Sequence, residues 1–253
     1  MPITQSVDAT GIAEVVMDNP PVNALNVAGW FELARIIRSL GEDPAVHVVV
    51  LRAEGRGFNA GVDIKEMQNT DGFDALIGAN KGCFAAFAAV YECAVPVIAA
   101  VNGFCLGGGV GLVGNADIVV ASDDATFGLP EVDRGALGAA THLARLVPQH
   151  RMRAMVYTAA TITAQELHHF GSVLEVVPHA ELRETAMRIA ADIAVKSPTV
   201  IRAAKESLNG IDPIDVKRSY RFEQGFTFEL NLSGVADEHR DAFVAKRETD
   251  TNT

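Results

Sequence analysis

The chain has 253 residues, of which 49% are apolar, and its formal net charge is −11 at pH 7. The apolar content argues against a disordered chain, and the acidic balance argues against a protein that binds nucleic acid through a basic face. Residues 93–116 carry no charge, but they contain Pro96, Asn102 and six glycines. This stretch therefore favours a buried strand and turn over a membrane-spanning helix.

The cysteines and the N-terminus bear on the compartment. No Lys or Arg precedes Arg35, so the positively charged start of a secretory signal peptide is missing. Cys83, Cys93 and Cys105 are odd in number and lack the spacing of metal ligands, which is typical of reduced core thiols. We therefore expect a cytoplasmic protein with no metal site and no membrane partner.

Strands and helices alternate through the first two thirds of the chain. Short β-branched runs predict strands at Val15–Met17, Val46–Leu51, Val95–Val101, Asp117–Ala121 and Val173–Val177. Apolar residues at helical spacing predict helices around 30–40 and 73–87. After about residue 178 the pattern changes to successive helices at 180–196, 199–209, 213–230 and 235–247. The expected class is α/β, with a core at 1–178 that carries the functional site. The helical C-terminal region at 179–253 is expected to close the pocket or to pack against a neighbouring subunit.

The segment AVNGFCLGGGVGLVGNAD (100–117) places three adjacent glycines after an apolar run. Gly109, Gly111 and Gly114 match G-x-G-x-x-G, the pattern of dinucleotide-binding turns. The next predicted strand begins at Asp117, too soon for the crossover helix that this fold requires. We therefore reject a dinucleotide site. The glycines indicate either backbone amides presented without side chains or close packing of a helix on a strand.

A second glycine-rich turn, RAEGRGFNAGVDIKEM (52–67), also follows an apolar strand. Asp63 is predicted to cap a helix, with Glu66 as its reciprocal partner. The Val62 amide would then lie at a helix entrance, where free N–H groups favour negative charge. Two such turns could aim one amide each at a single point and form an oxyanion hole. The alternative is an ordinary strand-to-helix turn.

At this point the chain resembles the crotonase superfamily, the enoyl-CoA hydratase/isomerase family. The matching stretches, in the family's order, are NPPVNAL (19–25), EGRGFNAGVDIKEM (54–67), VPVIAAVNGFCLGGGVGL (95–112), ATFGLPEVDRG (125–135) and DEHRDAFVAKR (237–247). The resemblance implies a crotonase-like ββα spiral core with a helical C-terminal region. It also implies an acyl-CoA thioester substrate, whose oxygen would bind the amides of Val62 and Gly108 as it becomes an enolate.

Hydratases of this family use two glutamates, and only one is present here. The first position, two residues after the triple glycine, is Gly111, whereas the second is Glu131 in the PE pair. The resemblance implies acid/base chemistry at Glu131, whose burial would raise its pKa toward the working range. Asp133 and His142 are candidates for a further polar group, with a solvated acid and a structural histidine at the start of a helix (142–147) as the alternatives.

Several stretches, among them LGAATHLARLVPQH and YRFEQGFTFELN, resemble a subgroup of this family, actinobacterial ring-opening hydrolases of cholesterol catabolism. This implies that water adds to a ring ketone of a bicyclic dione carboxyl-CoA and that a C–C bond breaks in a retro-Claisen step. The missing side chain at Gly111 predicts room for fused rings. The alternatives are an enoyl-CoA hydratase or isomerase of β-oxidation and a non-catalytic acyl-CoA- or RNA-binding relative.

The resemblance also implies a binding site for coenzyme A, carried as part of the substrate, and no other cofactor. The matching residues are Ala24, Ala60, Asp63 and Ile64, with Phe243 and Lys246 supplied by the last helix of an adjacent subunit. A homotrimer or a dimer of trimers is therefore expected.

Overall fold

The computed structural model describes residues 2–70, 72–236, 238–239 and 241–242. The strands are β1 (Ile3–Val7), β2 (Ile12–Met17), β3 (Val48–Ala53), β4 (Gly57–Asn59), β5 (Val97–Val101), β6 (Phe104–Leu106), β7 (Ile118–Ser122), β8 (Thr126–Gly128), β9 (Thr161–Thr163) and β10 (Glu175–Val177). The helices are α1 (Val27–Glu42), α2 (Ile64–Gln68), α3 (Asp74–Glu92), α4 (Gly108–Val113), η1 (Pro130–Arg134), α5 (Ala140–Leu143), α6 (Gln149–Thr158), α7 (Ala164–His169), η2 (His179–Glu181), α8 (Leu182–Ala194), α9 (Pro198–Gly210) and α10 (Val216–Leu232).

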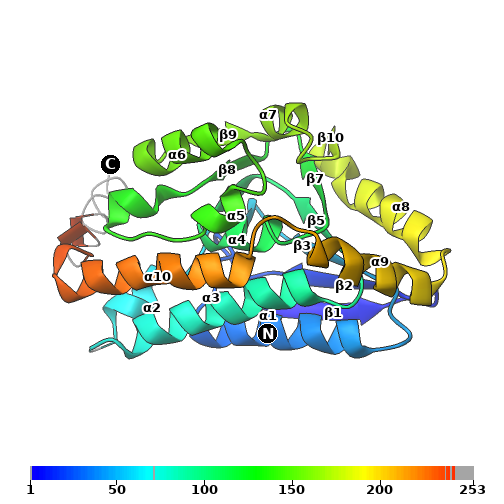
Figure 1. The fold of residues 1–253 in the computed structure, drawn as a ribbon, viewed down its shortest axis with the longest axis horizontal. Helices are drawn as coiled ribbons and strands as arrows, with labels where there is room; N and C mark the ends of the chain where they lie inside the picture. Colours follow the sequence, from blue (N-terminus) through cyan, green and yellow to red (C-terminus); the bar gives the residue numbers. More distant parts are fainter. Residues whose placement is uncertain (1, 71, 237, 240, 243–253) are drawn as a thin grey trace.

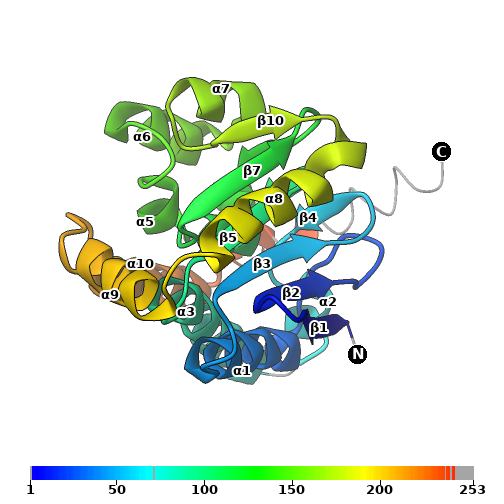
Figure 2. The same cartoon turned by 90° about the vertical axis from the view of Figure 1, so that its right-hand side faces the viewer.

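The larger sheet has six strands in the order β1-β2-β3-β5-β7-β10, and all neighbours except β1 and β2 pair in parallel. Its central strands are buried on both faces, as expected for a parallel sheet covered by helices. Alternate side chains point to opposite faces, so Val48 and Val50 pack with α8 while Val49 and Leu51 join the main core. Figure 2 shows α8 lying across β3, β5 and β7.

The smaller sheet, in the order β4-β6-β8-β9, positions the site. Each of β3, β5 and β7 is followed a few residues later by one strand of this second sheet, so the chain repeats the same two-strand step three times. Because β4, β6 and β8 pair in parallel, the segments that follow them emerge at the same edge. Those segments contain Val62, Gly108 and Glu131. The spiral thus brings three regions distant in sequence together.

The C-terminal helices α8, α9 and α10 follow β10, and α10 lies alongside α3 and α5 (Figure 1). The expected α/β class with a helical C-terminal region is confirmed. The helix predicted at 142–147 instead begins at Ala140 and ends at Leu143, and most of the helix predicted at 235–247 lies outside the described residues. The strands β4, β6, β8 and β9 were not predicted, because three residues are too few to show a period.

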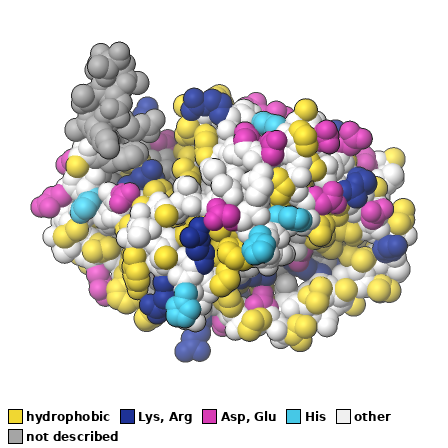
Figure 3. All heavy atoms as spheres, turned by 90° about the horizontal axis from the view of Figure 1, so that it is seen from above, with side chains coloured by type: hydrophobic (Ala, Val, Ile, Leu, Met, Phe, Trp, Pro, Cys, Tyr) yellow, Lys and Arg dark blue, Asp and Glu magenta, His cyan; other side chains and the backbone are white. Residues whose placement is uncertain are grey.

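Basic and acidic side chains are interspersed with apolar ones on the face shown in Figure 3. The three cysteines are buried and form no disulfide. In the part of the chain that the structure describes, no helix combines the length and apolar character needed to cross a membrane.

Candidate active site

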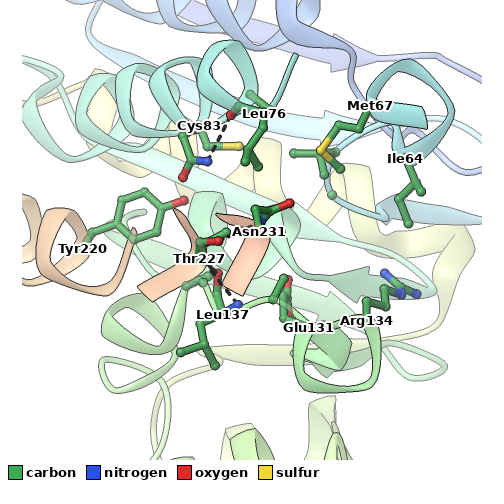
Figure 4. A pocket seen from close by; sticks show the side chains of 18 of the residues that line it. Ile64, Met67, Leu76, Cys83, Glu131, Arg134, Leu137, Tyr220, Thr227 and Asn231 are labelled. Carbon is green, nitrogen blue, oxygen red and sulfur yellow. Dashed lines mark hydrogen bonds between the residues drawn. The ribbon is translucent and has the colours of Figure 1, made fainter. Parts of the chain in front are cut away.

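A cavity open to solvent lies where the edge of the smaller sheet meets α3 and α10. Its walls come from the turn after β4, the start of α4, η1, the segment 136–139 and one face each of α3 and α10. Figure 4 shows Glu131 and Arg134 on one side, with Tyr220, Thr227 and Asn231 from α10 and Cys83 from α3 opposite. The cavity therefore draws on segments from residue 60 to residue 231.

The Val62 amide is directed by a parallel bridge to Leu25. Leu25 N–H donates to the Gly61 carbonyl at 3.0 Å, and Asp63 N–H donates to the Leu25 carbonyl at 2.9 Å. In a parallel bridge the residue between these two bonds turns its own N–H to the opposite side, and Val62 lines the cavity. Asn59 steadies the turn, since its Oδ1 accepts from Gly61 N–H at 2.8 Å while its Nδ2 donates to the Asn23 carbonyl at 2.5 Å.

The Gly108 amide is the first N–H of α4, and first-turn N–H groups have no acceptor within their own helix. A β-carbon added to Gly61 would lie 3.2 Å from the Gly108 nitrogen, so the two glycine-rich turns are in contact. A β-carbon on Gly108 would lie 2.7 Å from the Trp30 ring, and one on Gly109 would lie 2.6 Å from the Asn59 carbonyl oxygen. The same glycines thus allow the two turns to pack closely and leave the Gly108 amide without a side chain beside it.

Glu131 lies directly against the triple glycine. A β-carbon on Gly107 would be 2.6 Å from Glu131 Oε1, so only glycine leaves room for this carboxyl group. Its Oε2 is buried and has no hydrogen-bond partner among the described residues. Burial raises the pKa of Glu131 to about 7, although the Arg134 charge acts in the opposite direction. A carboxyl group with that pKa can take and return a proton near neutrality.

The position of the missing first glutamate is filled by an aromatic ring. A β-carbon on Gly111 would lie 2.2 Å from Cζ of Phe87, and Gly111 does not line the cavity, whereas Phe87 does. The prediction that Gly111 leaves room for fused rings is therefore wrong, because Phe87 occupies that space. The ring contacts Trp30, His142 and Tyr220, with centroid distances of 5.7, 4.9 and 5.2 Å.

Neither Asp133 nor His142 lines this cavity. Asp133 is exposed on η1. His142 is buried beside Phe87 and Tyr220 in a separate small cavity, and neither ring nitrogen has a hydrogen-bond partner among the described residues. Burial lowers the pKa of His142 to about 3, with Arg145 acting in the same direction, so the ring is neutral.

Only some of the residues expected to contact coenzyme A line the cavity. Ala60 and Ile64 line the cavity, while Ala24 does not and accepts at its carbonyl from Asn19 Nδ2 at 2.6 Å. Asp63 caps α2 through Lys65 N–H at 3.0 Å. Phe243 and Lys246 lie outside the described residues.

The reciprocal cap predicted for Glu66 is wrong. Its carboxylate instead accepts from Val27 N–H at 2.7 Å, at the start of α1. This contact joins the turn that carries Val62 to α1, across a separation in sequence that no local pattern reveals.

Sequence analysis gave the region 179–253 a role in pocket closure but singled out no residue of α10, although this helix supplies much of the cavity wall. Tyr220, Gln224, Thr227 and Asn231 are all buried, and their spacing of four, three and four residues places them on one face of the helix. This row of polar side chains on one face of a predicted helix was the sequence signal that could have indicated a cavity wall. Glu223 on the same helix accepts from Ala140 N–H at 2.7 Å and from Thr141 N–H at 3.1 Å.

The family described as Enoyl-CoA hydratase/isomerase matches residues 8–250. The chain belongs to this family. The predicted resemblance is therefore confirmed. Separately, the described ranges contain no cluster of three or more His, Cys, Asp or Glu side chains that could hold a metal ion.

Within the enoyl-CoA hydratase/isomerase family, the chain is similar to two curated hydrolases of one name, (7aS)-7a-methyl-1,5-dioxo-2,3,5,6,7,7a-hexahydro-1H-indene-carboxyl-CoA hydrolase. The protein of Rhodococcus jostii (strain RHA1) is 70% identical over 96% of this chain and 95% of its own length. That of Mycobacterium tuberculosis (strain ATCC 25618 / H37Rv) is 68% identical over 97% and 100%. A solved enoyl-CoA hydratase/isomerase from Xanthobacter autotrophicus Py2 superposes with a TM-score of 0.87 at 26% identity, covering 98% of this chain and 93% of that one.

Proposed function

We propose that this chain hydrolyses the hexahydro-indene-dione carboxyl-CoA named in its two hydrolase relatives, opening a ring of the substrate during cholesterol catabolism. Their 70% and 68% identity over nearly the whole chain supports this substrate. The observation that carries the reaction type is the pairing of one buried carboxyl group, Glu131, with the two touching glycine-rich turns. The aromatic ring of Phe87, and not a second carboxylate, stands beside it.

The chemistry uses these groups in two stages. Ionised Glu131 takes a proton from water while the water oxygen bonds to the ring-ketone carbon. The ring C–C bond then breaks in the retro-Claisen, lyase-like step, and its electron pair moves toward the thioester oxygen, which accepts hydrogen bonds from Val62 N–H and Gly108 N–H. Each donor of such an oxyanion hole contributes about 3 kcal/mol to transition-state binding. Glu131 then returns the proton to the released carbon.

The test is a substrate panel with purified protein. We expect rapid ring opening of the cyclic dione-CoA and little turnover of crotonyl-CoA or a 3-enoyl-CoA. Glu131→Gln should lower the rate by about 100- to 10,000-fold, the range typical of a general base, while coenzyme A binding persists. Hydration of crotonyl-CoA at ordinary enzyme rates would refute the proposal, and an unaffected Glu131→Gln would indicate a binding relative instead.

The assembly, the cofactor requirement and the compartment belong to the same proposal. We infer a cytoplasmic homotrimer or dimer of trimers that needs no cofactor beyond the coenzyme A of its substrate. Phe243 and Lys246 of one chain would close over the coenzyme A bound by another. Exposed apolar side chains on α10, including Phe222 and Phe226, support an interface along this helix. Light scattering of the full chain tests the assembly, and a monomer that keeps full activity would refute it.

A further inference from the structure

This inference rests on the proposed ring-opening reaction, which places negative charge on two oxygens in turn. The ring-ketone oxygen becomes an oxyanion when water adds, and the thioester oxygen becomes one when the C–C bond breaks. The amides of Val62 and Gly108 come from turns in contact with each other and serve one of these oxygens. The ketone oxygen therefore requires a separate hydrogen-bond donor in the same cavity.

Several polar side chains that line the cavity are held in place by hydrogen bonds within the protein. Thr227 Oγ1 donates its only hydrogen to the Leu137 carbonyl at 2.5 Å. Asn80 Nδ2 donates to the Leu76 carbonyl at 3.0 Å, and Asn231 Nδ2 donates to the Thr227 carbonyl at 2.7 Å. The first of these bonds joins α10 to the segment 136–139, and the other two fix the Asn80 and Asn231 side chains on their own helices. Tyr220 adds a phenolic hydroxyl on the wall opposite Glu131.

The Tyr220 ring is fixed by its neighbours. It is 6% exposed, and its centroid lies 5.2 Å from that of Phe87 and 4.9 Å from that of His142. Figure 4 shows its hydroxyl pointing into the cavity, toward Cys83 and Thr227 and across from Glu131. A rigid aromatic ring presents its hydroxyl without the entropy cost of ordering a flexible side chain.

The surroundings keep this hydroxyl protonated. Burial raises the pKa of Tyr220 well above its usual value, and Cys83, Glu223 and Glu131 act in the same direction, while a hydrogen bond with Gln224 acts in the opposite one. The phenol thus remains a donor at every pH where Glu131 can act as a base.

We propose that Tyr220 is a further catalytic residue, whose hydroxyl donates a hydrogen bond to the ring-ketone oxygen while water adds to it. Water loses a proton to Glu131 as its oxygen bonds to the ketone carbon, and the ketone π-electron pair moves onto the oxygen that Tyr220 contacts. When the C=O re-forms, the ring C–C bond breaks, and the proton held by Glu131 goes to the released carbon. One water is consumed, a carboxylic acid forms, and the thioester stays intact.

The experiment compares Tyr220→Phe with Tyr91→Phe. Tyr220→Phe keeps the ring that packs on Phe87 and His142 and removes only the hydroxyl. Tyr91→Phe removes a hydroxyl that bonds the Asn209 carbonyl at 3.1 Å, away from the cavity. We expect kcat for ring opening to fall about 100- to 1000-fold in Tyr220→Phe, with KM changed less than threefold. Tyr91→Phe should keep kcat within about twofold of the parent chain.

A second readout isolates the thioester half of the reaction. In D2O, the ring-opened product should exchange hydrogen for deuterium at the released carbon through Glu131 and the two amides alone. Tyr220→Phe should retain this exchange within about threefold, whereas Glu131→Gln should lose it. If Tyr220→Phe opened the ring at the parent rate, the role of Tyr220 would be refuted while the proposed function would stand. Equal losses of exchange and of ring opening in Tyr220→Phe would refute that role in the same way. Absence of ring opening in the parent chain would instead refute the proposed function.

Discussion

Replacing Gly111 by alanine tests whether Phe87 really occupies the place of the missing glutamate. The added β-carbon would lie 2.2 to 2.6 Å from three atoms of the Phe87 ring. Trp30, His142 and Tyr220 pack against the ring and resist its displacement. Relief of the overlap must therefore displace α4 or push the ring into the cavity.

The magnitude follows from two opposing effects. Overpacking a core costs about 1–3 kcal/mol, and an overlap with three atoms of a fixed ring belongs at the upper end. Alanine regains about 1 kcal/mol over glycine in a helix. We expect Gly111→Ala to lower the free energy of unfolding by about 2 kcal/mol. At about 2–4 °C per kcal/mol for a domain of this size, Tm should fall by about 4–8 °C.

Gly210→Ala is the control, because Gly210, at the end of α9, is exposed and an added β-carbon would contact no other element within 4 Å. It should be stabilising by up to about 1 kcal/mol. Urea unfolding at one protein concentration, followed by the fluorescence of the single tryptophan, Trp30, measures both variants. Equal stabilisation by the two substitutions would show that the ring does not fill the space beside Gly111.

Three further expectations follow from buried charges. Because the pKa of Glu131 is raised to about 7, kcat/KM should rise with pH and level off above about 7. Since that value exceeds the unfolded pKa of about 4.5, the stability linked to this group is present below pH 4.5 and lost as pH rises through 7. Glu131→Gln should therefore raise Tm at pH 8 and not at pH 4, and an equal effect at both would contradict the assignment. Glu223→Ala should cost about 1.5–3 kcal/mol, because it removes a charged acceptor from two N–H groups at the start of α5. It should also raise KM in steady-state assays, and an unchanged Tm would count against the contact. Lys205→Met should cost about 3–5 kcal/mol in urea unfolding, because it leaves Asp117, paired with Lys205 Nζ at 2.7 Å, without its partner. Arg35→Ala, at an exposed ion pair, is the control and should change stability little; equal effects would refute this reasoning.

Local sequence patterns were enough for the α/β class and for the two glycine-rich turns that meet at the cavity. Central strands such as β3 and β5 are continuous apolar runs because both of their faces are covered, and such runs are visible without a structure. The glycines at 107–109 marked the α4 entrance because any side chain there would collide with a neighbour. Short strands such as β4 and β8 were missed, since their pairing partners lie far away in sequence.

The sequence by itself predicted the family and, through the resemblance to it, the carboxyl group at 131 and the two turns beside it, because the family's motifs are residue types at fixed local spacing. Only the tertiary structure decided what surrounds them. Phe87 fills the space at Gly111, Tyr220 reaches the cavity from the other end of the chain, and Glu66 caps α1 instead of its own helix. Each of these contacts joins segments at least two dozen residues apart, and the packing of whole elements, not any local period, sets which side chains meet.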